Sequence, residues 1–283
     1  MALVNYSNEY SRLKKVILYR PRIAEIENHN PQKAMYISLP DAQKVLNEFD
    51  SIVRKLESLD IEVIVLEGNK NSVLTSNMIY LRDVATVFRD KVIISRMKHE
   101  IRQNEPEKLM NLLINNNSKF EETFICLSNG TIEGADIFVI NSNLIYVYIG
   151  NRTNCDAVQE IATLYPELEV KLIKAKINNI PQHILGGVHI VNKDLIIRRT
   201  QYCKDMIQDY KSVDFVEDIE TASGFALNFL TISPNEILMP SNRPKTKKIL
   251  EDYRIKCHEV DIDEIHKMGG GLACMVLPIL RES

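Results

Sequence analysis

The sequence has few cysteines, little glycine and no long apolar stretch, and these shortages exclude several classes of protein. Its five cysteines are odd in number, widely spaced and without a Cys-x-x-Cys pair, which argues against a disulfide framework and a structural zinc site. The longest apolar stretches are only strand-sized, which excludes a membrane-spanning helix. With a net charge of −3 and no run of five like charges, the chain lacks the basic face that nucleic-acid binders present.

The composition and the N-terminal residues predict one cytoplasmic domain. No basic segment followed by an apolar core opens the sequence, so we expect no signal peptide and a cytoplasmic protein with free thiols. No linker rich in Pro, Gly or Ser interrupts the 283 residues, and 45% hydrophobic with 26% charged residues is ordinary globular composition. We therefore expect a single domain over residues 1–283.

Four segments are each predicted to form two apolar strands joined by a short polar turn. Val, Ile, Phe and Tyr on either side of turn-forming Asn, Asp and Pro favour a hairpin in each. The turns centre near positions 90, 142, 193 and 235, at spacings of 52, 51 and 42 residues. A period of this kind is typical of propeller or solenoid repeats. The predicted hairpins are Ala85–Met97, Ile137–Gly150, Val188–Arg198 and Ala226–Met239.

Helical segments and further strands lie between the hairpins, so the repeating unit is hairpin, helix, strand. Apolar residues at a 3.6-residue period make Pro40–Asp60 the clearest helix. The shorter predicted helices are Pro106–Asn115, Cys155–Tyr165, Cys203–Tyr210 and Pro244–Tyr253, and the strands are Glu62–Leu66, Glu169–Lys174, Val213–Val216 and Cys257–Val260. Leu13–Arg20 begins a first, less regular copy. Five copies closing on themselves would form an α/β ring with the inner strand ends at one central cleft.

Glycine is scarce, with 10 residues, so the run Gly269-Gly270-Gly271 shortly before Cys274 is informative. Because glycine permits close approaches, one interpretation is a loop that lays a ligand against the main chain beside a nucleophilic thiol. The other interpretation is a tight turn before a buried, inert cysteine. This segment taken alone favours the second interpretation, because free Cys is commonly buried. A phosphate-binding loop is excluded because the Lys-Ser/Thr pair and the following helix are missing.

Three ionisable residues recur at the same place in successive repeats. Asp83, Glu133 and His183 lie 50 residues apart in turn, each ahead of a predicted hairpin. Taken singly, they are more simply explained as a structural ion pair, a solvated turn and a structural or surface histidine. Equivalent positions in a closed ring face the same cleft. Their shared register, with Cys274 in the last unit, therefore favours an active site.

A cysteine, a histidine and acids without a metal indicate covalent catalysis at an electrophilic carbon. We predict no metal site and no cofactor, since the other histidines lie in polar, helical or strand settings, and His258 and its neighbour Cys257 point to opposite faces of a strand. Two buried carboxylates select a cationic substrate, because a charged acid in a dry cleft is costly unless paired. A guanidinium is the natural match, being planar, always charged and able to take bidentate contacts.

These residues resemble those of the guanidino-group-modifying enzymes, whose fold is the five-bladed α/β propeller, or pentein. The similarity to arginine deiminases runs almost from end to end of the chain. The stretches that carry it are Glu9–Pro21, Asn77–Asp83, Ser95–Met97, Ile101–Glu105, Glu133–Asp136, Gly150–Asn154 and Gly269–Glu282. Together these stretches are specific, and any one alone would be weak.

The resemblance implies a role for each matching residue. Cys274 would attack the guanidinium carbon, and His183 would protonate the leaving amine and then activate water. Asp83 and Glu133 would hold the guanidinium, with Glu133 also orienting His183. The residues implied to bind the rest of the substrate are Arg102 and Arg152 at its α-carboxylate, Asn77 near that end, and Asp136.

Three departures from the deiminase pattern concern the substrate. Leu185 stands where deiminases carry a second guanidinium-binding Asp, and Ala135 replaces a glycine. The helical insertion of deiminases is absent, since only Gly68–Ser76 separates Glu67 from Asn77. A less polar neighbour could accommodate an N-substituted guanidine, as in the dimethylarginine hydrolases, which also lack this Asp.

We therefore expect a hydrolase that converts arginine or an N-substituted arginine to a citrulline-type product through a thiouronium adduct on Cys274. An amidinotransferase, which passes the amidine to an amine acceptor through the same adduct, stays open. A paralogue that binds a guanidine without efficient turnover also stays open. A ribosome-binding translation factor is a further alternative, but the presence of Cys274 and His183 argues against it. The expected partner is a small guanidine, not nucleic acid or a membrane, and a homo-oligomer stays open.

Overall fold

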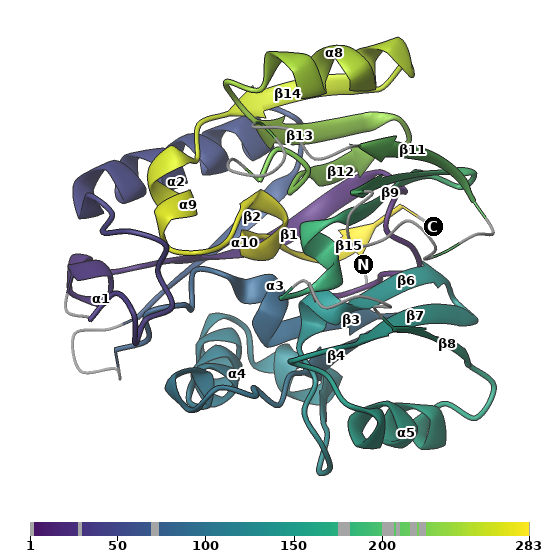
Figure 1. Ribbon diagram of the computed structural model, residues 1–283. Helices are drawn as coiled ribbons and strands as arrows, with labels where there is room; N and C mark the ends of the chain where they lie inside the picture. The colour runs from purple at the N-terminus through teal and green to yellow at the C-terminus, as the bar shows by residue number, and fades with distance from the viewer. Residues whose placement is uncertain are drawn as a thin grey trace.

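The strands of the protein pair into five sheets of three strands each, with helices between them (Figure 1). The computed structural model describes residues 3–27, 30–68, 74–174, 182–199, 207, 210–215, 220 and 225–282. Helices α2, α4, α5 and α8 lie at the periphery of the sheets (Figure 1). None of the helices in these ranges has the length and apolar character needed to cross a bilayer. The mixed α/β fold with small sheets agrees with the predicted repeats.

Four of the sheets share one construction. An antiparallel hairpin is followed, after a crossover, by a third strand that runs parallel to the hairpin's second strand. The strands are β3 (Ala85–Phe88), β4 (Lys91–Ile94) and β5 (Phe124–Cys126); β6 (Ile137–Asn141), β7 (Leu144–Ile149) and β8 (Glu169–Lys174); β9 (Val188–Asn192), β10 (Leu195–Arg199) and β11 (Lys211–Phe215); β12 (Leu230–Ser233), β13 (Glu236–Pro240) and β14 (Lys256–Val260). All four predicted hairpins are present, and β5 is a strand that the sequence pattern did not predict.

The first sheet is assembled from both ends of the chain. Strand β1 (Leu13–Arg20) pairs in parallel with β2 (Glu62–Glu67) and antiparallel with β15 (Leu277–Arg281). The N-terminal segment is also bonded to β15, since Asn5 N donates to Ile279 O over 2.8 Å. The predicted first copy is therefore completed by the last strand, which the local pattern did not indicate.

The predicted helices are present wherever the structure describes them. The longest, α2 (Ala42–Glu57), is capped by Asp41, whose side chain accepts from Lys44 N at 3.0 Å, and it buries one apolar face. The others are α4 (Glu105–Asn116), α5 (Cys155–Leu164) and α8 (Pro244–Asp252), with the short helices α1 (Ile23–Glu27), α3 (Leu81–Val84), α9 (Asp263–Lys267) and α10 (Leu272–Met275). Most of the predicted helix Cys203–Tyr210 lies outside the described residues.

Short helical turns stand at the entry to several sheets and determine where the candidate residues lie. Helix α3 leads directly into β3, and α10 precedes β15. Two 3₁₀ turns, η3 (Gly134–Asp136) and η4 (Ile184–Gly186), precede β6 and β9 in the same way. Residues at these entries come from segments far apart in the sequence but occupy equivalent places in their units.

A buried carboxylate, Glu25 in α1, joins three elements. Both of its oxygens accept from the Tyr19 hydroxyl of β1, at 2.8 and 2.9 Å, and Lys108 Nζ of α4 lies 2.6 Å away. Thr75 Oγ1 donates to the same carboxylate at 3.2 Å. Burial opposes ionisation, but hydrogen bonds from Arg22 and Lys108 outweigh it and lower the pKa of Glu25 to about 2.

Replacing Glu25 by Gln tests this junction. The change removes the buried negative charge that pairs with Lys108, so we expect the free energy of unfolding in urea to fall by about 3 kcal/mol. Because the folded pKa of Glu25 lies below its ordinary value of 4.5, its contribution is present above that pH and is lost as the pH falls toward 2. The difference between wild type and variant should therefore shrink in acid.

Glu27→Gln is the matched control, since Glu27 lies in the same helix with its side chain exposed. It should leave the urea midpoint within a few tenths of a molar of wild type. Equal destabilisation by the two variants would contradict a structural role for the Glu25 junction.

Candidate active site

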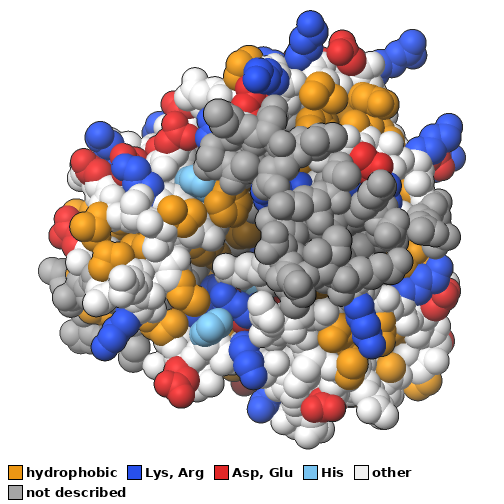
Figure 2. Space-filling model, in the orientation of Figure 1, with side chains coloured by type: hydrophobic (Ala, Val, Ile, Leu, Met, Phe, Trp, Pro, Cys, Tyr) orange, Lys and Arg blue, Asp and Glu red, His pale blue; other side chains and the backbone are white. Residues whose placement is uncertain are grey.

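A cavity of about 260 Å³ gathers residues from segments spread over most of the chain. On the face seen in Figure 2, a hollow lies near the middle of the molecule, with hydrophobic side chains along one side. The residues that line the cavity are Met35, Asn77, Tyr80, Asp83, Arg102, Gln182, His183, Gly186, Arg199, Phe225, Asn228, Met268, Gly269, Gly270 and Cys274. Cationic, anionic, imidazole and thiol groups thus share one small space with aromatic and thioether side chains.

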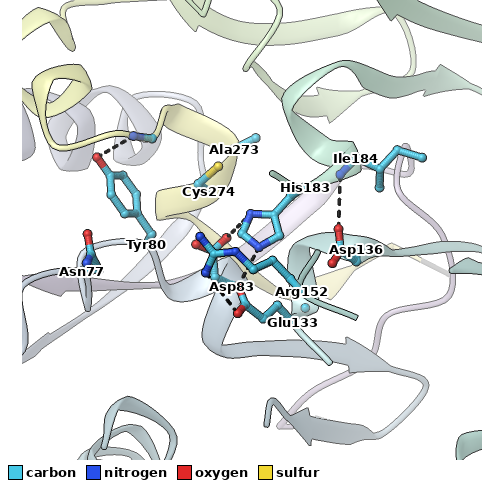
Figure 3. A network of polar contacts seen from close by, with 12 residues as sticks. Asn77, Tyr80, Asp83, Glu133, Asp136, Arg152, His183, Ile184, Ala273 and Cys274 are labelled. Atoms are coloured by element: carbon cyan, nitrogen blue, oxygen red, sulfur yellow. Dashed lines mark hydrogen bonds and ion pairs between the residues drawn. The ribbon is translucent and has the colours of Figure 1, made fainter. Parts of the chain in front are cut away.

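The predicted residues at the hairpin entries meet here. Asp83 comes from α3, Glu133 immediately precedes η3, His183 immediately precedes η4, and Cys274 lies in α10. Ligating atoms of Asp83, Glu133 and His183 all lie within 4.8 Å of one another. Figure 3 shows the Cys274 sulfur above the His183 ring, with the Asp83 carboxylate nearby. The shared register of the sequence therefore corresponds to a shared place in space.

The His183 imidazole lies between two carboxylates. Its Nε2 is 2.6 Å from Oε2 of Glu133, and its Nδ1 is 3.6 Å from Oδ1 of Asp83. Burial favours the neutral ring, but the negative charges of Asp83, Asp136 and Glu133 outweigh it and raise the pKa of His183 to about 9. The ring is therefore protonated at neutral pH, with Nε2 held by Glu133 and Nδ1 on the side of the cavity-lining Asp83.

Each of the two carboxylates is paired with an arginine of the protein. Arg102 Nη1 lies 2.7 Å from Asp83 Oδ2, and its Nε lies 2.8 Å from Glu105. Arg152 Nη1 lies 3.3 Å from Glu133 Oε1. Burial raises the pKa of Glu133, but bonding to His183 and the neighbouring positive charges prevail and lower it to about 2. Both arginines therefore hold acids in place, and of the two only Arg102 lines the cavity.

The Cys274 thiol is buried beside an amide. Asn228 Nδ2 donates to Cys274 Sγ at 3.3 Å, and Asn228 Oδ1 accepts from Ala273 N at 2.7 Å. Burial and the nearby Asp83 carboxylate raise the pKa of the Cys274 thiol to about 12. At neutral pH the sulfur is therefore protonated unless a positive charge enters the cavity.

The glycine run before Cys274 is required by close packing. Gly269 has φ of +95°, and a Cβ there would lie 2.7 Å from the Met35 carbonyl oxygen. A Cβ on Gly271 would lie 2.6 Å from the Asn228 side chain. The run therefore lets the loop press against the cavity wall, next to the thiol.

The other residues predicted for substrate binding differ in their access to the cavity. Asn77 lines it and donates from Nδ2 to Ala34 O at 2.9 Å. Asp136 accepts from Thr153 Oγ1 at 2.7 Å and from Ile184 N at 3.3 Å, and it is fully buried. Of the described residues, neither Asp136 nor Glu133 lines the cavity. Protein groups surround these two acids in this geometry, and their direct contact with a substrate stays a prediction.

Leu185 also lies elsewhere than expected. It packs in a hydrophobic cluster with Phe138 and Val188 and faces a second, smaller cavity of about 20 Å³. It is therefore not among the residues that line the cavity of about 260 Å³.

Sequence reasoning missed Asn228, which lies two residues ahead of β12. The signal was present, since Asn228 precedes the fourth predicted hairpin turn as Asp83 precedes the first. The residue type alone does not indicate an active site, because Asn is a common turn-forming residue. Arg199 at the end of β10 and Phe225 were missed as well, and both line the cavity.

Asp83, Glu133 and His183 could in principle offer ligands to a metal ion. In the described structure, however, His183 bonds to Glu133, and the carboxylates bond to Arg102 and Arg152. A cation would compete with both guanidinium groups for the same oxygens. The donor set is thus accounted for by ion pairs, and the absence of a metal remains a prediction.

Comparison with known proteins places this geometry in a family. The sequence model described as N,N dimethylarginine dimethylhydrolase, eukaryotic, matches residues 23–281. A Bacillus subtilis protein named as uncharacterized protein YkgA is 24% identical over 282 residues, 96% of this chain and 94% of that one. The dimethylarginine dimethylaminohydrolase of Pseudomonas aeruginosa is 20% identical, over 86% and 91%. An arginine deiminase of Listeria monocytogenes is 24% identical, over 73% and 62%.

Solved structures have the same fold. The Pseudomonas aeruginosa dimethylarginine dimethylaminohydrolase in complex with citrulline aligns with a TM-score of 0.77 and 18% identity, covering 95% of this chain and all of that one. SxtG, an amidinotransferase from Microseira wollei, aligns with a TM-score of 0.77 and 14% identity, covering 99% and 98%.

The family match spans nearly the whole chain, and the resemblance predicted from the sequence motifs is confirmed at the level of the superfamily. The chain belongs to the N,N dimethylarginine dimethylhydrolase family of guanidino-group-modifying enzymes.

Proposed function

We propose that the protein hydrolyses the guanidinium group of arginine or an N-substituted arginine through a covalent adduct on Cys274. The observation that carries the proposal is that Cys274, His183 and Asp83 line one small cavity in a chain of this family. The products are a citrulline-type ureido compound and ammonia or an amine. The site works without a metal or cofactor, in a protein of the cytoplasm.

We also propose that the five sheets are the blades of a closed propeller around this cavity. Contacts between neighbouring units support the closure: β15 with β3, α3 with η3, η3 with η4, β9 with β12, and β12 with β1. The last of these joins the fifth sheet to the first, as a ring requires. In such a ring the hairpin entries face the axis, where the reacting groups gather.

Asp83 is the acid that receives the substrate guanidinium. Its Oδ2 is held by Arg102, whereas Oδ1 has no hydrogen-bond partner among the described residues. An anionic oxygen in a buried cavity is costly unless paired, so a cationic guanidinium is stabilised there. Arg102 and Arg152 then act as positioning residues for Asp83 and Glu133, in place of the direct carboxylate binding implied by the resemblance.

The bound cation also prepares the nucleophile. A positive charge beside Cys274 offsets the burial and the Asp83 charge that raise the pKa of the thiol, so the thiolate forms when substrate binds and its proton leaves to solvent. The sulfur attacks the guanidinium carbon, the C–N bond to the leaving amine breaks, and protonated His183 supplies the proton from Nδ1. An S-alkylthiouronium adduct remains on Cys274.

Water completes the turnover. Neutral His183 now accepts one proton from the attacking water, and the resulting hydroxide adds to the thiouronium carbon. The C–S bond breaks, and the hydroxyl proton passes to the departing thiolate, so that the neutral ureido product and the Cys274 thiol are restored. Glu133 keeps the ring oriented through Nε2 in both steps. Acid–base catalysis by a group positioned in this way contributes about 10²–10⁴ in rate.

An amidinotransferase is the second candidate, favoured by the likeness of the fold to SxtG over almost the full length of both chains. The two reactions share the adduct and diverge only in whether water or an amine attacks it. The test incubates the protein and EDTA with arginine, N-methylated arginines or simple guanidines, with and without added glycine or lysine. A hydrolase should yield the ureido product, detected by mass spectrometry, in both conditions. Ornithine that appears only with an added amine would establish transfer instead.

Cys274→Ser should lower kcat by about 10³-fold or more, because a hydroxyl in this buried setting is a far weaker nucleophile. Intact-protein mass spectrometry of wild type quenched during turnover should reveal an adduct that the variant lacks. Cys155→Ser is the control, since Cys155 is an exposed free thiol, and it should retain full activity. Turnover by Cys274→Ser would show that the nucleophile is misassigned.

The pH profile tests the role of His183. Because the leaving amine takes its proton from His183, kcat/KM should fall as the pH rises through about 9. Glu133→Gln removes a negative charge that raises the His183 pKa, so this alkaline limb should move down by about one pH unit. Glu100→Gln, a change at an exposed residue, should leave the limb in place. An unmoved limb in Glu133→Gln would argue against His183 as the acid.

A further inference from the structure

The amide of Asn228 has a defined orientation against the Cys274 sulfur. Asn228 is almost completely buried, with 1% of its surface exposed. Ala273 N donates to Asn228 Oδ1 over 2.7 Å, so the amide oxygen must point at the main chain and Nδ2 must point at Sγ, 3.3 Å away. A flipped amide would set its NH₂ group against the N–H of Ala273.

Packing prevents the amide from turning away. The Asn228 Cγ atom occupies the space that a Cβ on Gly271 would need, at 2.6 Å. On its other side, Asn228 N donates to Phe225 O over 2.7 Å, which holds the main chain in place. The absence of a side chain at Gly271 therefore has a specific consequence, since it admits the amide that contacts the sulfur.

The surroundings of the sulfur make this donor important. The Asp83 carboxylate and burial both disfavour a thiolate, whereas the Asn228 amide favours it. In the described part of the chain no hydrogen bond joins His183 to Sγ, so the imidazole does not hold the sulfur directly. Asn228 supplies a neutral donor at the one atom that must become negative.

We propose that Asn228 is a positioning residue that stabilises the Cys274 thiolate and fixes the direction from which the sulfur attacks. The role deepens the proposed function, on which its catalytic meaning rests. It also assigns a site residue to the fourth repeat, so that the entries to all four hairpins and the segment before β15 each contribute one group to the site.

The test is alkylation of Cys274 by iodoacetamide without substrate, followed by peptide mass spectrometry between pH 7 and 9. Losing a hydrogen bond to the charged form raises the pKa of the Cys274 thiol. A smaller fraction of Cys274 is then present as thiolate at a given pH. Each remaining thiolate is more basic and therefore a somewhat better nucleophile, which offsets part of the loss. Asn228→Ala should therefore be alkylated about three- to tenfold more slowly than wild type.

Asn228→Asp is the sharper variant, because it keeps the shape and the acceptor for Ala273 N but replaces the donor with a negative oxygen. It should be alkylated at least as slowly as Asn228→Ala, and kcat should fall more than KM changes. Asn192→Ala, which removes an amide hydrogen bond to Asn235 away from the cavity, is the matched control and should be alkylated at the wild-type rate.

Wild-type alkylation rates in both Asn228 variants would overturn the inference and leave the proposed function standing. Because alkylation needs no substrate, slow alkylation in a protein that turns over no guanidine would support the contact while defeating the proposed function. Circular dichroism shows whether each variant folds. If Asn228→Ala does not fold, the alkylation rate of Asn228→Asp decides whether Asn228 stabilises the thiolate.

Discussion

The site depends on pairing buried charges. Moving one ion from water into a protein interior costs several kcal/mol even after relaxation, so an unpaired carboxylate would be protonated or exposed. Here Asp83 is held by Arg102 at 2.7 Å, Glu133 by Arg152 at 3.3 Å, and the His183 ring lies between the two acids. These pairs place a protonated imidazole and the Asp83 carboxylate beside a neutral thiol.

The repeats explain how these groups come together. Asp83, Glu133 and His183 lie at the short turns α3, η3 and η4, which enter the first three hairpins. Asn228 lies ahead of the fourth hairpin, and α10 carries Cys274 ahead of β15. Strand β15 completes the first sheet, and its pairing with β1 brings the segment that carries Cys274 back to the beginning of the chain. A site on rigid strand entries needs little rearrangement to hold a small substrate.

Several roles implied by the family resemblance change when contacts are considered. Arg102 and Arg152 are engaged by acids of the protein, and Asp136 is enclosed by Thr153 and Ile184. Leu185 packs in the core and does not border the cavity. Residue type and register were right about which side chains gather. They could not say which partner each would choose, because ion pairing depends on distances of a few ångströms.

Local patterns in the sequence predict the hairpins, most helices and the equivalent positions of Asp83, Glu133 and His183. These follow from short-range patterns, since turn residues and apolar periods act within a few residues of one another. Contacts between distant segments are what place β15 in the first sheet, bring Asn228 to the Cys274 sulfur and bury Glu133 against His183. Those outcomes arise where segments distant in the chain pack together, and their contacts have no counterpart in any local run of residues.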